Sequence, residues 1–231
     1  MTRNSQLLSR LVEAVAQGPA SRPLTSRVCH AARDLLRADG ASLTMENSTP
    51  NRVMLCATDR RSDHLEDLQD VLGEGPYLDA FDLNQPVLTG LDDVAAQRWP
   101  EFVPAAADVI GPAGELWSLP MRFGGQPIGA VGLYRLSPGR LAEPSDAAQS
   151  LADAAAAILL TDPLAFAESA NAGSWSSRAV VHQATGMLIA QLAIDPEAAL
   201  AILRSHAFAC GADLQQVARA VVDRKLDLAC L

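Results

Sequence analysis

Hydrophobic positions along the first part of the chain follow the two periods that distinguish helices from strands. Apolar residues in 5–17 and in 25–38 recur every three or four positions, which predicts two helices. Segments 41–46 and 52–58 instead alternate between apolar and polar residues, and turn-forming residues separate them. These two segments are therefore predicted to form an antiparallel hairpin.

The same two periods predict the remaining elements up to about residue 160. In order, they are a helix at 63–72 ended by the GEGP loop at 73–76, a strand at 86–89, a helical or irregular stretch at 94–109 interrupted at Trp99-Pro100, strands at 116–123 and 127–136 joined at Gly124-Gly125, and a helix at 144–160. This order predicts an α+β fold, in which helices pack beside an antiparallel sheet.

A small, polar segment at 169–177 (SANAGSWSS) predicts a linker, and three short amphipathic helices are expected after it. The first runs from Ser176 or Ser177 to about Leu192. Asp195-Pro196 is a strong start for the second, which ends at Cys210-Gly211, and Asp213 is the expected cap of the third. The predicted organisation is an α+β domain at 1–162, a connector at 163–175 and an all-α, three-helix domain at 176–231.

The charge is concentrated in the first part of the chain. The whole sequence has 18 Lys and Arg against 27 Asp and Glu, a net charge of −9. Residues 172–231 contain five basic and five acidic residues, so the excess of acid lies entirely before them. Because acidic surfaces repel phosphate, any contact with nucleic acid is expected through the C-terminal helices.

Neither a membrane segment nor a secretory signal is expected. The longest uncharged stretch, 179–194, is too short and too polar to span a bilayer, and Arg10 and Glu13 interrupt the apolar part of the N-terminus. A cytoplasmic protein is therefore predicted. Cysteines 29, 56, 210 and 230 form no paired motif, so buried or idle thiols are expected rather than disulfides or a zinc site.

Catalytic motifs are not found in the sequence. It contains no nucleophile elbow, phosphate-binding loop, zinc-binding helix or nucleotide-binding fingerprint, and its four histidines (30, 64, 182 and 206) are far apart in the sequence. We therefore expect no enzymatic activity, no catalytic residue, no metal ligand and no cofactor.

Two stretches resemble known families. LEDLQDVLGEGPYLDAFDLNQPVLTGLDD (65–93), RWPEF (98–102) and LPMRFGGQPIGAVGLYR (119–135) resemble the GAF sensor domains of bacterial two-domain regulators. SRAVVHQATGMLIAQLAIDPEAALAILRSHAFACGADLQQVARAVV (177–222) resembles an ANTAR domain. The two resemblances cover most of the chain, in the order that such regulators use.

This resemblance implies a transcription antiterminator. In that family the ANTAR domain binds paired small stem-loops in nascent RNA and keeps a terminator hairpin from forming. The GAF domain binds a small molecule or transmits a partner's signal, and dimers are usual. The expected partners are thus RNA stem-loops, an unknown small molecule and a second copy of the chain, without a membrane.

The resemblance also implies a set of RNA-binding residues. They are Arg178, His182, Gln183, Thr185, Gly186, Arg204 and Arg219. Thr185 stands where the family most often has Lys or Arg, and Ala212-Asp213 replaces a polar or basic stretch, so weaker RNA binding with a flatter salt dependence is expected. Structural alternatives remain open: the arginines as ordinary solvated or paired residues, Gly186 as a helix-packing residue, and the histidines as partly buried polar groups.

In the sensor half, the resemblance places a ligand pocket between the sheet and the loops around GEGP. Glu74, Tyr77 and Trp99 are the candidate lining residues, since aromatic walls with a polar group are typical of such sites. A purely structural role for all three is the alternative. Tyr77 stands where relatives often have Cys, which argues against a sensing thiol there.

A second function also fits the sequence. The chain is then a ligand-sensing module whose degenerate ANTAR tail serves only protein–protein association. Thr185, Asp213 and the overall acidity support this alternative.

Overall fold

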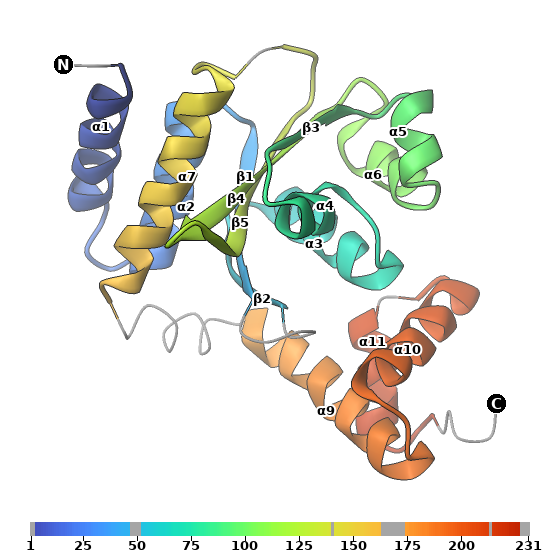
Figure 1. Cartoon of the computed structure of the whole chain (residues 1–231). Coiled ribbons are helices and arrows are strands. Elements are labelled where there is room, and N and C mark those ends of the chain that lie inside the picture. The colour runs from blue at the N-terminus through green and yellow to red at the C-terminus, as the bar shows by residue number, and fades with distance from the viewer. Residues whose placement is uncertain (1–2, 47–51, 140, 163–173, 213, 227–231) are drawn as a thin grey trace. The chain divides into compact units, whose positions relative to one another are not determined.

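The structure is a computed structural model that describes residues 3–46, 52–139, 141–162, 174–212 and 214–226. The chain divides into two compact units, Met1–Ser169 and Ala170–Leu231, which we call the N-terminal unit and the C-terminal unit (Figure 1). Each unit is described by itself.

A five-stranded antiparallel sheet forms the centre of the N-terminal unit. Its strands are β1 (Gly40–Glu46), β2 (Arg52–Ala57), β3 (Val87–Gly90), β4 (Glu115–Phe123) and β5 (Gln126–Arg135). They lie in the order β2-β1-β5-β4-β3, and every neighbouring pair is antiparallel. Both predicted hairpins, β1–β2 and β4–β5, are confirmed, and so is the α+β fold class.

Three helices lie on one side of this sheet (Figure 1). They are α1 (Arg3–Gln17), α2 (Leu24–Leu36) and α7 (Ser145–Leu160). Helices α2 and α7 lie against the strands, and α1 lies outside, against α2 and α7. The side of α7 that packs inward consists largely of alanine, whose small side chain lets the helix lie close to the strands. The larger members of this core include Leu11, Leu36, Leu43, Leu119, Val131, Leu151 and Leu159.

Four helices lie on the opposite face (Figure 1). They are α3 (Arg60–Leu72), α4 (Pro76–Leu83), α5 (Asp93–Arg98) and α6 (Phe102–Ile110). Their core contains Leu65, Trp99, Phe102, Ile110 and Tyr134. The helices on this face are short, so loops and caps fix their positions more than long packed stripes do.

The predicted elements on this face need two corrections. Helix α3 begins at Arg60 rather than at residue 63, because the Asp59 side chain accepts hydrogen bonds from the backbone of Arg61 and Ser62. Helix α4 was not predicted, although Pro76 stands at its favoured first position. The predicted interruption at Trp99-Pro100 is confirmed, because it separates α5 from α6.

The C-terminal unit consists of three helices in its described part. They are α9 (Ser174–Leu192), α10 (Pro196–Cys210) and α11 (Leu214–Val222), as the apolar pattern predicted. Asp195 caps α10 by accepting from the Ala198 N–H, and Gly211 ends it in the left-handed conformation. The predicted cap Asp213 lies outside the described residues. The buried side chains include Ala184, Leu188, Ala199, Leu203, Leu214, Val217 and Val221.

Candidate functional site

The two faces of the sheet carry side chains of very different size. Successive residues of a strand point to opposite faces. Toward α1, α2 and α7 the central strands present large apolar residues such as Leu43, Leu119 and Val131. Toward α3 they present Ser42 on β1, Ser118 on β4 and Gly132 on β5 instead. Ser42 and Ser118 both pair with Gly132, so the three form one row across the sheet.

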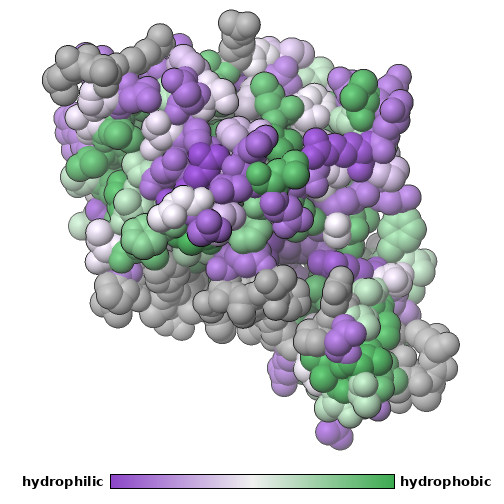
Figure 2. Space-filling view, in the orientation of Figure 1, coloured by the Kyte–Doolittle hydropathy of each residue, from purple (hydrophilic) through white to green (hydrophobic). Residues whose placement is uncertain are grey.

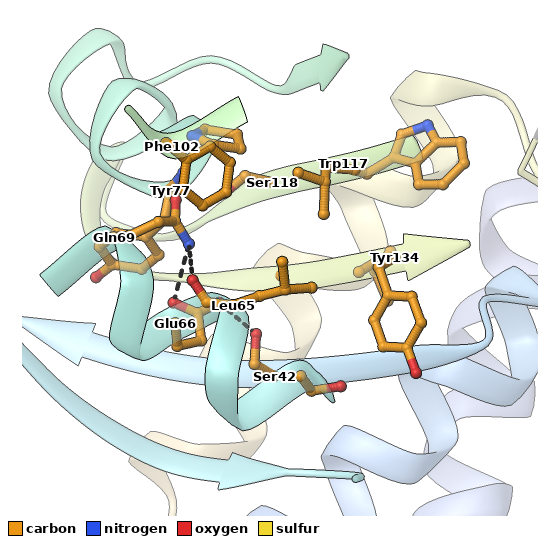
Figure 3. Close-up of a pocket in the computed structure, with 14 residues that line it drawn as sticks. Ser42, Leu65, Glu66, Gln69, Tyr77, Phe102, Trp117, Ser118 and Tyr134 are labelled. Atoms are coloured by element: carbon orange, nitrogen blue, oxygen red, sulfur yellow. Dashed lines mark hydrogen bonds between the residues drawn. The ribbon is translucent and has the colours of Figure 1, made fainter. Parts of the chain in front are cut away.

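This row is the floor of a small cavity that is partly open to solvent. A Cβ at Gly132 would overlap Ser42 Oγ and would lie 2.6 Å from Glu66 Oε1, so the glycine keeps the floor low. Helix α3 contributes Leu65, Glu66 and Gln69 to the opposite wall, and Pro76, Tyr77 and Phe102 come from α4 and α6 (Figure 3). The cavity volume is about 20 Å³. A cavity needs roughly 10–15 Å³ to hold one water, so this one has the size of a single small group.

Polar groups of the cavity form a connected network. Ser42 Oγ donates to Glu66 Oε1 at 2.5 Å, and Gln69 Nε2 donates to Glu66 Oε2 at 3.4 Å. Gln69 Oε1 accepts from the Tyr77 N–H at 2.7 Å, which ties α4 to α3. Ser118 Oγ is buried and has no hydrogen-bond partner among the described residues. The cavity therefore offers one spare hydroxyl beside a carboxylate.

A buried arginine neutralises this carboxylate. Arg52, on the edge strand β2, forms ion pairs with Glu66 and, at 2.7 Å, with Asp70. Its guanidinium also lies 3.7 Å from the centroid of the Tyr77 ring. Burial raises the pKa of Tyr77, although the nearby Arg52 charge opposes that shift. Arg52 thus joins β2, α3 and α4 around the cavity.

Of the three predicted ligand-binding residues, one lines the cavity and two lie elsewhere. Tyr77 lines the cavity, as the sequence suggested. Glu74 does not; its Oε1 accepts from the backbone N–H groups of Glu101 and Phe102, at 2.7 and 2.8 Å, and so caps the start of α6. Trp99 is buried in the core, where its Nε1 donates to Asp79 Oδ2 at 3.1 Å.

Sequence reasoning missed the residues that shape the cavity floor. Ser42, Ser118 and Gly132 belong to strands that are far apart along the chain, and only the strand register aligns them. A small or polar residue at an inward strand position was the available signal. Without the register, that signal does not indicate a shared site.

A larger, open groove of about 730 Å³ runs along the edge strand β3. Its lining combines apolar side chains, including Leu88, Trp117 and Leu141, with the carboxylates of Glu115 and Glu143. Glu143 is 3.7 Å from Arg10 in an ion pair. We take the cavity as the candidate sensor site because a hydrogen-bonded network from β1, α3 and α4 lines it.

Three residues of α9 form an exposed surface in the C-terminal unit. Gln183, Gly186 and Ala190 are spaced by three and four positions, so they share one side of the helix, and all three are exposed. We call this the Gly186 face. Figure 2 shows hydrophobic side chains exposed over this unit, and Phe208 of α10 is one exposed apolar residue, at 61%.

Gly186 makes no close contact with the described residues of its unit outside its own helical turns. A Cβ built there has no described heavy atom within 4 Å, and its backbone conformation is an ordinary one for L residues. The alternative that Gly186 permits close helix packing is therefore not supported. Glycine in the middle of a helix costs about 1 kcal/mol relative to alanine. No contact in the described part of the unit offsets this cost.

The other predicted RNA-binding residues differ in how far they are exposed. Thr185 is buried, and its hydroxyl donates to the Val181 carbonyl at 2.8 Å, so it does not face outward. Arg219 is exposed on α11, whereas Arg204 is half-buried on α10 with its Nε atom inside. Arg178 and His182 belong to α9, but their side chains lie outside the described residues.

No helix in the described ranges is long and apolar enough to cross a membrane. Within the same ranges, no three His, Cys, Asp or Glu side chains are grouped closely enough to hold a metal ion.

Two family models match the chain. The GAF domain model matches residues 23–160, and the ANTAR domain model matches residues 174–222. No curated protein matches. Among solved structures, the GAF domain of the Acinetobacter phosphoenolpyruvate-protein phosphotransferase is 11% identical with a TM-score of 0.48, covering 70% of this chain and 95% of its own. The A. aeolicus nlh2 GAF domain in an inactive state is 8% identical with a TM-score of 0.43, covering 68% and 96%. With its GAF match spanning more than half of its length, the chain belongs to the GAF domain family and has the two-domain GAF-ANTAR architecture.

Proposed function

We propose that this protein is a signal-responsive RNA-binding antiterminator, active as a cytoplasmic homodimer. Its ANTAR helices bind paired stem-loops in nascent RNA, and its GAF domain controls that binding in response to a small molecule or partner. The proposal assigns the chain no catalytic step. The observation that carries it is the exposed Gly186, a helix-weakening residue with free space around it.

An RNA loop suits the Gly186 face. Glycine is used where another molecule must approach a backbone closely. Unpaired loop bases are recognised by shape, stacking and hydrogen bonds to their edges, and the exposed Gln183 amide can both donate and accept. Of the described cations of this unit, Arg204 is half-buried and Lys225 pairs with Asp223 at 3.0 Å, so few phosphate contacts are expected. The proposal therefore includes weak salt dependence.

The sensor part of the proposal rests on the small size of the cavity. About 20 Å³ accommodates a water-sized group, so a larger ligand requires α3 and α4 to move away from the sheet. A ligand that binds the opened form more tightly shifts the population toward it. Arg52 and Gln69 hold these two helices closed, and their contacts are the ones that a ligand must compete with.

Gly186→Leu tests the RNA face directly. Binding of the full chain to a tandem stem-loop RNA is measured at low salt for the wild type, for Gly186→Leu and for the control Ser205→Leu, an exposed position on α10. We expect a loss of at least tenfold with Gly186→Leu and little change with Ser205→Leu. Equal losses, or none in either variant, would contradict the assignment of RNA to this face.

Protein association through the C-terminal unit is the second candidate function. The exposed Phe208 and the buried Thr185 hydroxyl favour it. In that case the wild type does not bind the RNA at low salt, and Phe208→Ser abolishes assembly in sedimentation measurements. RNA binding that survives Phe208→Ser favours the antiterminator instead.

A further inference from the structure

Two cysteines that are distant in sequence face each other in the GAF domain. Cys29 lies on the inward side of α2, and Cys56 lies on β2 at the edge of the sheet. Cys29 Sγ is 3.9 Å from the Cys56 carbonyl oxygen and donates to the Ala41 carbonyl oxygen at 3.4 Å. Both thiols are free.

An irregularity in the sheet turns Cys56 toward the helix. The β1–β2 register pairs Leu43 with Cys56 and Thr44 with Met54, so β2 has one extra residue, Leu55, at this point. Such bulges redirect side chains at sheet edges. As a result Leu55 belongs to the core under α2, and the neighbouring Cys56 packs against the same core.

The two thiols differ in exposure and in ease of ionisation. Cys29 is fully buried, whereas Cys56 is only partly buried. Burial, with a further contribution from Cys56, raises the pKa of Cys29. A hydrogen bond from Cys29 lowers the pKa of Cys56 against the effect of burial, and Ser26 and Arg22 lower it further. Cys56 is thus the thiol that ionises more readily and is accessible to solvent, and Cys29 lies next to it.

We propose that Cys29 and Cys56 form a redox modification site, which hydroperoxides convert to an intramolecular disulfide. The thiolate is the reactive form of cysteine, and a sulfenic acid condenses with a neighbouring thiol. A lone exposed cysteine can form the sulfenic acid, but it has no neighbouring thiol with which to form the disulfide. The site is independent of RNA binding and of the small-molecule cavity.

The chemistry balances with hydrogen peroxide as the oxidant. The Cys56 thiolate attacks one peroxide oxygen, the O–O bond breaks, and hydroxide leaves and takes up a proton to give water. Cys56 is then a sulfenic acid. Cys29 loses its proton and attacks the Cys56 sulfur, the S–O bond breaks, and the departing hydroxide takes that proton to give a second water. The two cysteines together lose two electrons and two protons.

Peptide mapping of the full chain tests this proposal. Cys210→Ser/Cys230→Ser leaves only the pair, and this variant is treated with hydrogen peroxide, alkylated after unfolding and digested with trypsin. Cleavage at arginine releases residues 28–33 (VCHAAR) and 53–60 (VMLCATDR) as separate peptides. We expect these two to appear as one disulfide-linked species that dithiothreitol separates. Unlinked peptides, with Cys56 oxidised beyond the sulfenic acid, would overturn the proposal.

Single variants of the same background separate the two roles. In Cys29→Ser, we expect dimedone to trap a sulfenic acid on Cys56, because no thiol remains to resolve it. In Cys56→Ser, Cys29 is expected to stay reduced until the protein is unfolded. Oxidation of Cys29 in folded Cys56→Ser at the wild-type rate would contradict the assignment of Cys56 as the attacking thiol.

Discussion

The guanidinium of Arg52 packs against the ring of Tyr77, 3.7 Å from its centroid, while it pairs with Glu66 on another helix. One side chain from an edge strand therefore fixes the two helices that close the sensor cavity. The closed form of the cavity and the stability of the GAF domain therefore both depend on Arg52.

Arg52→Ala is expected to destabilise the GAF domain strongly. It leaves Glu66 buried without its compensating charge, and breaking a buried pair in this way costs about 3–5 kcal/mol. Urea unfolding measures the change. Arg33→Ala is the matched control, because Arg33 pairs with the largely exposed Asp34 and its loss should cost about 1 kcal/mol or less. Similar losses in the two variants would refute a structural role for the Arg52 cluster.

Glu74 is predicted to stabilise helix α6 rather than to bind a ligand. Glu74→Ala removes the acceptor for the Glu101 and Phe102 N–H groups, which should cost roughly 1–2 kcal/mol, as for the loss of a helix cap. Glu74→Gln keeps one carbonyl oxygen and should lose less. Thermal unfolding compares the stability of the wild type, Glu74→Ala and Glu74→Gln. An unchanged melting temperature in Glu74→Ala would show that the cap does not stabilise the protein.

Gly186→Ala is expected to make the C-terminal unit more stable, by up to about 1 kcal/mol, because the added methyl meets open space and alanine favours helix. Gly211→Ala is the control. Gly211 also has open space around it, but its φ of 59° disfavours a side chain, so that variant should be less stable. Opposite signs of the two effects in thermal unfolding are the predicted outcome; a less stable Gly186→Ala protein would mean that the glycine is needed inside the unit.

Both tyrosines of the chain should ionise at unusually high pH in the folded protein. Burial, with Asp59 adding to it, raises the pKa of Tyr134 to about 12, and burial also raises that of Tyr77. An unfolded tyrosine titrates near pH 10. Since the folded state holds these protons more tightly, the contribution to stability is complete below about pH 10 and is lost as the pH rises toward 12. Tyrosinate absorbance at pH 10 in a protein with native circular dichroism would disprove this.

Local patterns predicted most of the elements, because helix periods, caps and turn residues act over a few positions. Asp195-Pro196 and Gly211 mark the ends of α10 as expected. Helix α4 was missed because eight residues give too few turns for a clear period, and the glycines before Pro76 suggested only a loop.

The candidate sites were harder to predict, since they depend on strand register and on long-range packing. Glu74 and Trp99 were chosen for their residue types, but the structure uses both to hold the helices in place. The Cys29–Cys56 pair depends on one bulge in β2, which no local pattern reveals. Gly186, in contrast, was chosen through the family resemblance, and its role in RNA binding stays a prediction.

The salt dependence of RNA binding tests the central claim most directly. Affinity of the full chain for a tandem stem-loop RNA is measured across a salt series for the wild type, for Arg219→Ala and for Arg60→Ala, an exposed arginine of the GAF domain. We predict binding at low salt, with a log–log slope that is shallower by about 0.7 in Arg219→Ala, the value for one lost phosphate contact on a single strand, and unchanged in Arg60→Ala. No binding of the wild type at the lowest salt, with or without candidate ligands, would contradict the account.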